Sequence, residues 1–330
     1  LAGMKITDRI HQIVTPTPFP TGAVNCYVIK DDPVTLVDSG LKMEEPLEGL
    51  RSGLAEIGLE FGDIERLLIT HSHLDHYGLM ATVAAHGNPK VYAHPLEVYD
   101  IENPEGYSDE DDHYRRTERF LLDSGLPRER LASILTRHPV FRQLRDPIVV
   151  TDTVEDGDTI AFEHGEVLVI HCPGHSPGML NFYDAAEQIL FSGDNLLKHI
   201  SPVPLIYLPR DPSQPRANSL AAYIASIKRL KTFAIRCVLP GHGEIIHDIG
   251  AIIDSMLLHH ETRKGAVRAF LDGSPKTAYD VCLHLFPEIS EIQIYLGMSE
   301  AVGHLDLLEA EGLVKPEKKN GKTYFRRVDA

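Results

Sequence analysis

Four potential metal ligands lie within six residues, directly after an apolar segment, and this feature constrains the fold more than any other. The segment Leu67–Thr70 is short and apolar, as expected for a buried strand. The ligands that follow it are His71, His73, Asp75 and His76. Buried polar side chains need partners, so core packing does not explain this cluster. Because imidazole and carboxylate groups together suit zinc, iron or manganese, the sequence predicts a metal site at the end of a strand.

Three further candidate ligands follow strand-like runs later in the chain, each beside glycine or proline. They are His175 in PGHSPG, Asp194 in FSGD and His242 in LPGHG. Glycine and proline allow sharp turns of the backbone, which could bring these side chains over one point. Each signal is weak alone, but loops at strand ends are where rigid scaffolds place chemistry. Together with the first cluster they predict a single site.

Strand-like and helix-like runs occur in an order that predicts a layered α/β fold. The strand-like runs include Arg9–Thr15, Val24–Lys30, Val34–Asp38, Leu67–Thr70, Pro147–Val150 and Glu166–Ile170. The helix-like runs are Glu44–Ile57, Leu220–Phe233 and Asp248–Leu271. Mixed elements in this order predict two sheets packed together with helices outside.

A charged helical segment, Glu97–Asp146, interrupts this pattern between two strand-like runs. It is too long for a simple connection, and insertions of this size often form lids over a site. Arg115, Arg116 and Arg119 are spaced so that they could pair with an anionic substrate tail. The same spacing also fits a solvated helix face, so the segment is predicted to be either a lid or surface decoration.

The last part of the chain predicts a small second domain. Helix-like runs at Thr277–Leu285 and Ser299–Glu311 precede two short strand-like runs, an order typical of a winged helix-turn-helix. We therefore expect a catalytic domain over residues 1–272 and a winged-helix-like domain over residues 273–330. A length of 330 residues is consistent with two domains.

Charge disfavours duplex DNA as a partner of this domain. The whole chain has 32 basic and 48 acidic residues, giving a net charge of −16. The helix in the recognition position contains only acidic charges, whereas a helix in the major groove needs cationic and amide side chains. These acidic residues are Glu300, Asp306, Glu309 and Glu311. Basic residues gather instead at Lys315–Arg327, where they could contact RNA, an anionic cofactor or only solvent.

Cysteine usage and hydropathy indicate a cytoplasmic protein without membrane contact. The four cysteines are scattered and form no CxxC pair, which disfavours a disulfide framework or a cysteine-type zinc site. No apolar run reaches the roughly 18 residues needed to span a bilayer, and the N-terminus lacks the apolar stretch of a signal peptide.

With these residues in place, the chain resembles the metallo-β-lactamase superfamily, in particular the dinuclear hydrolase branch typified by glyoxalase II. The resemblance covers residues 4–250 and implies an αββα sandwich with the site at one edge. It implies one metal ion held by His71, His73 and His175 and a second held by Asp75, His76 and His242. It also implies that Asp194 bridges both ions, and that Asp75 and Asp194 are the catalytic carboxylates. The C-terminal tail resembles that of the β-lactamase-like protein 2 branch.

This resemblance implies a metal-dependent hydrolase with two divalent ions. Zinc is favoured, and iron or manganese are alternatives. A hydroxide bridging the ions would attack an ester-like, anionic small molecule, with thioesters and lactones favoured. Two alternatives stay open: a phosphodiesterase or ribonuclease, because part of the winged-helix branch acts on RNA, and a mononuclear iron persulfide dioxygenase, which shares the HxHxDH motif. β-Lactamase activity is disfavoured, because Asp194 stands where that branch has cysteine.

Residues beyond the ligand set give weaker predictions. His199 and Tyr207 lie in a proline-rich loop and could bind substrate or donate a proton. Cys172 is expected to be structural, and His171 is expected to support a ligand. His259 and His260 are expected on the outer face of the long helix. Homo-oligomerisation is compatible with the sequence but not predicted by it.

Overall fold

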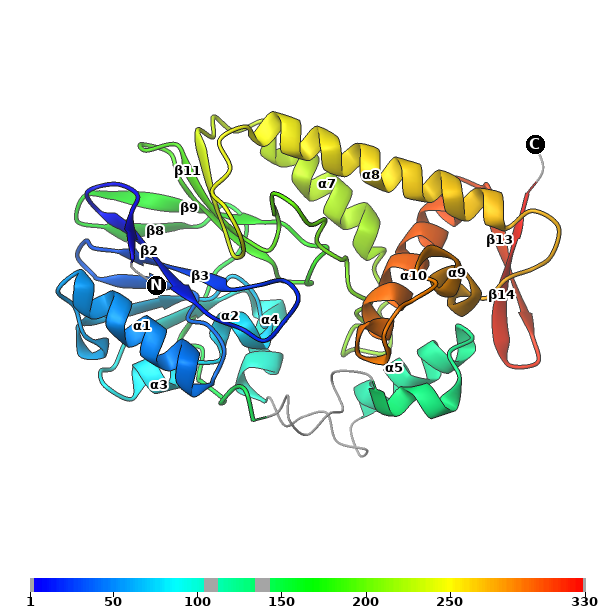
Figure 1. Ribbon diagram of the computed structural model, residues 1–330, viewed down its shortest axis with the longest axis horizontal. Helices are drawn as coiled ribbons and strands as arrows, with labels where there is room; N and C mark the ends of the chain where they lie inside the picture. The colour runs from blue at the N-terminus through cyan, green and yellow to red at the C-terminus, as the bar shows by residue number, and fades with distance from the viewer. Residues whose placement is uncertain (1–2, 104–111, 134–142, 329–330) are drawn as a thin grey trace.

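The computed structural model describes residues 3–103, 112–133 and 143–328. Figure 1 shows two sheets stacked at one end of the molecule, with helices on both outer sides. The first is a seven-stranded sheet in sequence order, antiparallel from β1 to β4 and parallel from β4 to β7. Its strands are β1 (Met4–Lys5), β2 (Ile10–Thr15), β3 (Val24–Ile29), β4 (Thr35–Val37), β5 (Arg66–Leu68), β6 (Lys90–Ala93) and β7 (Asp152–Thr153).

The second sheet has five strands in the order β12-β11-β10-β9-β8. Its strands are β8 (Thr159–Phe162), β9 (Gly165–His171), β10 (Leu180–Asp184), β11 (Ile189–Gly193) and β12 (Cys237–Pro240). β8 to β11 are antiparallel, and β11 pairs with β12 in parallel. All residues of β10, β11 and β12 are buried, because this sheet is covered on both faces.

Three apolar layers hold the sandwich together. The middle layer lies between the sheets, where Tyr27 of β3 meets Phe191 of β11 in an edge-to-face contact at 5.6 Å. The first outer layer packs the helices α1 (Glu44–Glu56) and α3 (Met80–Ala84) on the first sheet. The second packs α7 (Ser219–Leu230) and the start of α8 (Ile249–Phe270) on the other sheet. The order of layers is αββα, as predicted.

The segment predicted as an insertion packs against the C-terminal elements. It contains α4 (Pro95–Glu102), α5 (Asp112–Asp123) and the 3-10 helix η2 (Arg128–Ser133). Leu121, Leu126 and Leu131 share an apolar cluster with the end of α8 and with the helices beyond it. The rest of this prediction, residues 104–111 and 134–142, lies outside the described residues. In the described part, α5 therefore belongs to the core of the C-terminal half.

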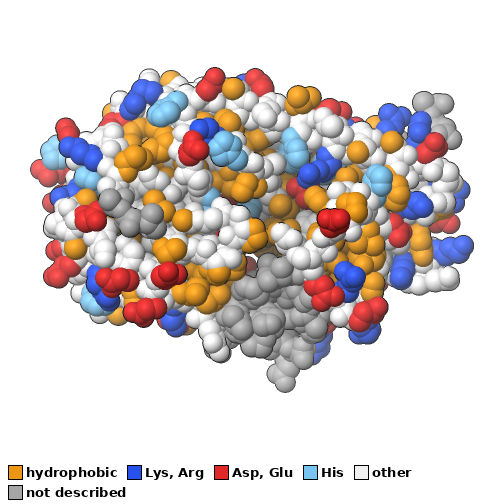
Figure 2. All heavy atoms as spheres, in the orientation of Figure 1, with side chains coloured by type: hydrophobic (Ala, Val, Ile, Leu, Met, Phe, Trp, Pro, Cys, Tyr) orange, Lys and Arg blue, Asp and Glu red, His pale blue; other side chains and the backbone are white. Residues whose placement is uncertain are grey.

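The C-terminal elements follow the predicted order of helices and then strands. They are α9 (Ala278–Leu285), the 3-10 helix η4 (Glu291–Gln293), α10 (Ile294–Ala310), β13 (Val314–Lys319) and β14 (Lys322–Arg327). Thr277 and Asp280 form a capping box at the start of α9. Figure 2 shows Lys and Arg side chains at the end of the molecule occupied by β13 and β14. The winged-helix designation and the domain boundary at 272/273 stay predictions.

Several sequence predictions were wrong at the level of elements. α10 begins at Ile294 rather than Ser299, and burial on nearly all sides hides its helical periodicity. The run Pro147–Val150 is not a strand, because pairing with β6 begins only at Thr151. His260 is 1% exposed rather than on an outer face, because α10 covers that side of α8.

No helix among the described residues is both long and apolar enough to cross a bilayer. The helix α8 has 22 residues, and it carries charged and histidine side chains along its length.

Candidate metal centre

The seven predicted ligands meet at one edge of the sandwich, although they come from four separate loops. His71 and His73 follow β5, and Asp75 and His76 lie in the short helix α2 (Leu74–Tyr77). The others follow β9, β11 and β12. Three groups have ligand atoms within 4.8 Å of one another: His71 with His73 and His175, His71 with His76 and Asp194, and Asp75 with His76 and His242.

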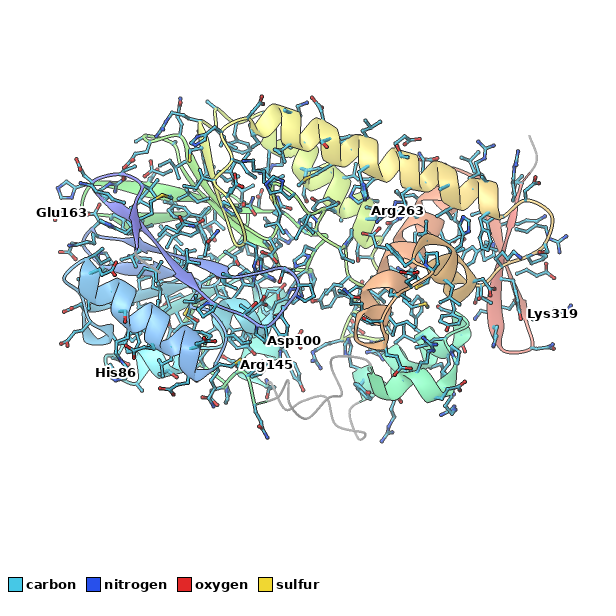
Figure 3. The ribbon with its side chains drawn as sticks, in the orientation of Figure 1. His86, Asp100, Arg145, Glu163, Arg263 and Lys319 are labelled. Atoms are coloured by element: carbon cyan, nitrogen blue, oxygen red, sulfur yellow. The ribbon has the colours of Figure 1, made fainter. Side chains whose placement is uncertain are left out.

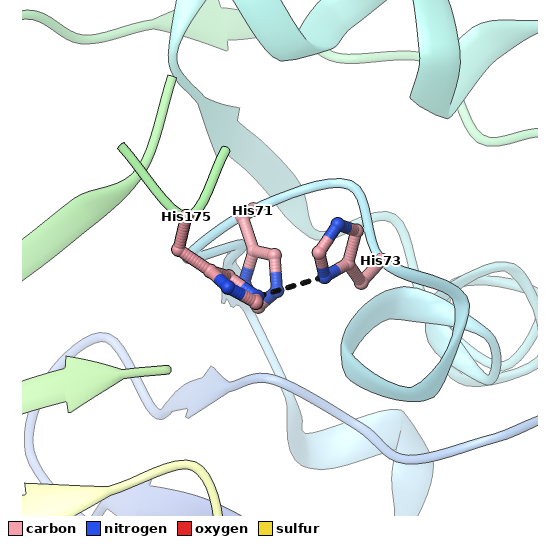
Figure 4. A group of neighbouring side chains, drawn as sticks. All are labelled: His71, His73 and His175. Carbon is pink, nitrogen blue, oxygen red and sulfur yellow. Dashed lines mark hydrogen bonds between the residues drawn. The ribbon is translucent and has the colours of Figure 1, made fainter. Parts of the chain in front are cut away.

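The three histidines of the first group, His71, His73 and His175, lie close together. Nδ1 of His73 lies 3.0 Å from Nε2 of His175, as the dashed line in Figure 4 shows. The ring of His71 lies 4.4 Å from that of His73 and 5.1 Å from that of His175, between centroids. Three imidazoles thus converge from two loops, one after β5 of the first sheet and one after β9 of the second.

Asp194 lies between the two halves of the cluster. Its Oδ1 is 3.4 Å from Nε2 of His76, and its Oδ2 is 3.7 Å from Nε2 of His175. Oδ2 is also 3.6 Å from Nε2 of His242, which in turn lies 3.5 Å from Oδ2 of Asp75. The carboxylate of Asp194 therefore faces imidazoles of both predicted triads.

Most of these imidazoles are oriented by a hydrogen bond at Nδ1, the ring nitrogen that points away from the cluster. Nδ1 is hydrogen bonded in four of them: His71 to Thr70 Oγ1, His76 to Asp38 Oδ2, His175 to Val203 O and His242 to Ala23 O, at 2.9–3.0 Å. Among the described residues, Nε2 of His71, His76 and His242 and Oδ1 of Asp194 are buried without a hydrogen-bond partner. Orphaned buried polar atoms are rare, and imidazoles fixed through one nitrogen are typical of metal ligands. The donor set therefore fits divalent cations.

The electrostatic environment keeps part of this cluster in the form that coordinates metal. Burial, together with neighbouring imidazoles, lowers the pKa of His71 well below its usual value and that of His73 to about 3. Burial alone would raise the pKa of Asp75, but His76 and His242 hold it at about 2. Neutral imidazole and ionised carboxylate are the ligand forms, so these groups need not lose a proton to bind an ion.

The pKa values of two other histidines in the cluster are raised rather than lowered. Burial would lower the pKa of His76, but the carboxylates of Asp194 and Asp38 raise it well above the usual value. Asp194 and Asp75 raise the pKa of His242 in the same way, against burial. The carboxylates therefore attract positive charge to this half of the cluster, either as protons or as bound cations.

A glycine gives the loops room to approach. A Cβ at Gly241 would lie 2.5 Å from Oδ1 of Asp194 and 2.7 Å from Cε1 of His76, which no side chain tolerates. This explains why glycine precedes His242.

Sequence reasoning missed two buried carboxylates that support the cluster. Asp38 accepts hydrogen bonds from the N–H and Oγ1–H of Thr70 and contacts His76. Glu97 accepts from the backbone N–H of Ser72 at 3.0 Å and from that of Gly178 at 2.6 Å, so it joins two ligand loops. The segment VDSG at a strand end was a signal for Asp38; nothing local distinguished Glu97.

The weaker candidates separate in the structure. The hydroxyl of Tyr207 lies 3.0 Å from Nε2 of His73, so Tyr207 borders the cluster. His199 is exposed and faces Glu244 at 3.4 Å, outside the cluster.

Nε2 of His171 donates to the carbonyl of Pro177 in the loop of His175, which agrees with a supporting role. Cys172 is fully buried in an apolar cluster, and burial raises its pKa to about 12.

The loop of Tyr207 is anchored by the predicted insertion. From α5, His113 contacts the carbonyl of Leu208 through Nε2 at 2.6 Å, and Arg116 donates to the carbonyls of Pro209 and Arg210 at 2.9 and 2.8 Å. Arg116 therefore holds this loop rather than projecting towards a substrate tail.

Comparison with known proteins places these observations in a family. A family model described as "Metallo-beta-lactamase superfamily" matches residues 19–242. A protein of Bacillus subtilis named "Probable metallo-hydrolase YqjP" is 30% identical over 98% of this chain and 99% of its own. The crystal structure of a metallo-beta-lactamase family protein from Thermus thermophilus superimposes with a TM-score of 0.83 at 28% identity, over 98% of this chain and 100% of that one.

A more distant relative has a named activity. "Atrochrysone carboxyl ACP thioesterase dmxR1" of a Cryptosporiopsis strain is 27% identical over 126 residues, which are 38% of this chain and 35% of that protein.

Proposed function

Because the chain belongs to the metallo-β-lactamase superfamily, we propose that it is a dinuclear metallohydrolase of an ester-like small molecule, with thioesters and lactones favoured. One observation supports this most: the carboxylate of Asp194 faces imidazoles of both triads, at 3.4 Å from His76 and at 3.6–3.7 Å from His242 and His175. A carboxylate so placed can hold two cations and offset their mutual repulsion.

The proposed ligands are divided between two ions. One ion would be held by His71, His73 and His175 and the other by Asp75, His76 and His242, and Asp194 would serve both. Zinc is favoured for this nitrogen and oxygen set, and iron or manganese are alternatives. When bound, the ions would supply Lewis acidity and a water molecule whose pKa is lowered to about 7.

The protein itself would position the substrate at the open side of the cluster. His73 and Asp75 are the half-buried members, whereas His71, His76 and His242 are buried, so we place substrate entry beside the former pair. The half-buried Tyr207 hydroxyl lies on the same side, where it can orient His73 or donate a hydrogen bond to a bound ester. His199 plays no part in this arrangement. The four described cysteines are free and buried, in keeping with the proposed cytoplasmic location.

The thioester class is supported by the relative named as an acyl carrier protein thioesterase, which matches 38% of this chain. A phosphodiesterase is the second candidate, because exposed basic side chains on β13 and β14 could bind a nucleic-acid backbone. Duplex DNA remains disfavoured: α10 is buried along most of its length and so cannot enter a major groove.

Metal analysis and a substrate panel test the proposal. We expect purified protein to contain about two ions in the cluster and to hydrolyse a thioester or a lactone, and the Asp194→Ala variant to lose both ions and turnover. Turnover confined to bis-p-nitrophenyl phosphate or single-stranded RNA would replace the proposal with the phosphodiesterase. Dioxygen uptake with glutathione persulfide and a single iron would replace it with the dioxygenase.

A further inference from the structure

A second buried cluster of metal-ligand side chains lies between α8 and α10, separate from the centre described above. It consists of His260 of α8 and Glu300 and His304 of α10, which offer ligand atoms within 4.8 Å of one another. All three side chains are buried, with residue exposures of 1%, 3% and 0%. Each of these side chains has a partner at one atom, but burying the remaining polar atoms unpaired is costly, so those atoms need an explanation.

Each imidazole of this cluster is hydrogen bonded through one ring nitrogen: Nδ1 in His304, as in the first centre, and Nε2 in His260. Nδ1 of His304 donates to the carbonyl of Glu300 at 2.8 Å, and Nε2 of His260 lies 3.2 Å from Oγ of Ser201. The other nitrogen of each ring, Nε2 of His304 and Nδ1 of His260, is buried without a hydrogen-bond partner among the described residues. Nδ1 of His260 is therefore left for a ligand, whereas the ring of His304 also lies near the backbone of His260.

The carboxylate is oriented in a similar way. Arg263, one turn after His260 on α8, lies with Nη1 2.9 Å from Oε2 of Glu300, and Figure 3 shows Arg263 in the space between α8 and α10. A ligating carboxylate is commonly held by such an outer partner.

From this geometry we infer that His260, Glu300 and His304 form an additional binding site for one divalent transition-metal ion of the zinc class. Two imidazole nitrogens and one carboxylate oxygen match the ligands that zinc takes, with a fourth position left to solvent. The ion would join α8 to α10 and so tie the C-terminal elements to the helix that also covers the second sheet. The cluster shares no side chain with the metal centre described above.

Two cavities are lined by residues next to the cluster, although none of the three proposed ligands lines either cavity. One, of about 190 Å³, is lined by Ser201, Met256 and His259 among others. The second, of about 320 Å³, is lined by His259, Thr262 and Arg263 among others. The cavities therefore border Ser201, which contacts His260, and Arg263, which contacts Glu300.

Metal stoichiometry tests the inference. The intact protein and the variants His260→Gln and His304→Gln are loaded with zinc, desalted and analysed by mass spectrometry. We expect each variant to contain about one zinc equivalent less than the intact protein and to keep its kcat within a few-fold of the intact protein's value. This difference does not depend on how many ions the first metal centre holds. His247→Gln, which alters an exposed histidine, is the control and keeps the full complement. Equal zinc content in all four proteins overturns the inference.

A second measurement covers the case in which these variants fold poorly. The Asp194→Ala variant weakens the catalytic cluster and leaves the second cluster intact. Zinc added to it should raise the melting temperature by a few degrees, because an ion that binds only the folded state stabilises it. The double variant with His260→Gln should show no such shift. A shift of the same size in both proteins contradicts the inference, as does its absence from both. Failure of the dinuclear proposal would change the total zinc count but not this difference.

Discussion

The Oδ2 atom of Asp38 lies 2.9 Å from Nδ1 of His76, and both side chains are buried at the junction of the first sheet and the metal-ligand loop. Asp38 is thus the outer partner of an imidazole whose Nε2 faces Asp194. Its second contact, with the backbone N–H and hydroxyl of Thr70, fixes the carboxylate to the end of β5.

The first prediction follows from this contact. Asp38→Asn keeps the shape of the side chain but removes the charge that favours His76 as an N–H donor. We expect metal affinity to fall about 10–100-fold, the usual cost of losing such a partner. Competition with a chromophoric chelator measures it. Unchanged affinity would show that His76 needs no carboxylate to be oriented.

Glu97 provides the second prediction. Glu97→Ala leaves the N–H groups of Ser72 and Gly178 without their acceptor, so the loops of His73 and His175 lose a common anchor. Each buried N–H left unpaired costs about 1–3 kcal/mol. We expect lower unfolding free energy together with weaker metal binding, and partial rescue by Glu97→Gln. Glu102→Gln on the same helix alters a contact to Val150 and should leave metal binding unchanged.

Cys172 is predicted to be dispensable for chemistry. Its thiol is buried in the apolar cluster beneath α7, and its raised pKa of about 12 keeps it protonated at neutral pH. Cys172→Ala should keep kcat within about 3-fold and cost about 1 kcal/mol of stability through lost packing. Steady-state kinetics and thermal unfolding decide the matter, and complete loss of turnover would assign the thiol a chemical role.

Stability in acid should depend on Asp31. Burial would raise its pKa, but hydrogen bonds from His164 and Arg9 hold it at about 2. Since the folded-state pKa lies below the ordinary value of 3.8, the contribution is complete above about pH 4 and is lost as pH falls towards 2.

Urea unfolding at a series of pH values tests this. At pH 7, Asp31→Asn should lower the unfolding free energy by on the order of 2 kcal/mol, and the difference from the natural chain should shrink below about pH 4. Asp8→Asn, at an exposed position, should have no comparable effect. A difference that persists unchanged at pH 2.5 would contradict the assignment.

The last prediction concerns the contact of α5 with the loop that follows Tyr207. Arg116→Ala removes two hydrogen bonds to the carbonyls of Pro209 and Arg210, so the loop should become less ordered. We expect KM to rise several-fold while metal content stays the same. Arg119→Ala changes an exposed residue on the same helix and serves as the control. Equal KM values in both variants would mean that α5 does not support substrate binding.

Local sequence patterns were sufficient to single out the seven residues that meet in the structure and to predict the layered architecture. Two of these patterns are local in sequence. One is HxHxDH directly after an apolar strand, and the other is glycine or proline beside His175, Asp194 and His242. The lengths of the strand-like and helix-like runs likewise predicted α1, α7 and α8 to within a few residues. Such signals can be read without the fold because they depend only on residues close in sequence.

Packing between distant segments determines the features that the sequence did not reveal. Glu97 lies 25 residues from Ser72 and 81 from Gly178, so no local pattern shows that it joins their loops. α10 is covered on nearly all sides, which removed the amphipathic period that would mark its start and placed Glu300 and His304 beside His260. Burial is a property of the packed chain, and it alone separates an exposed histidine such as His199 from a buried one such as His260.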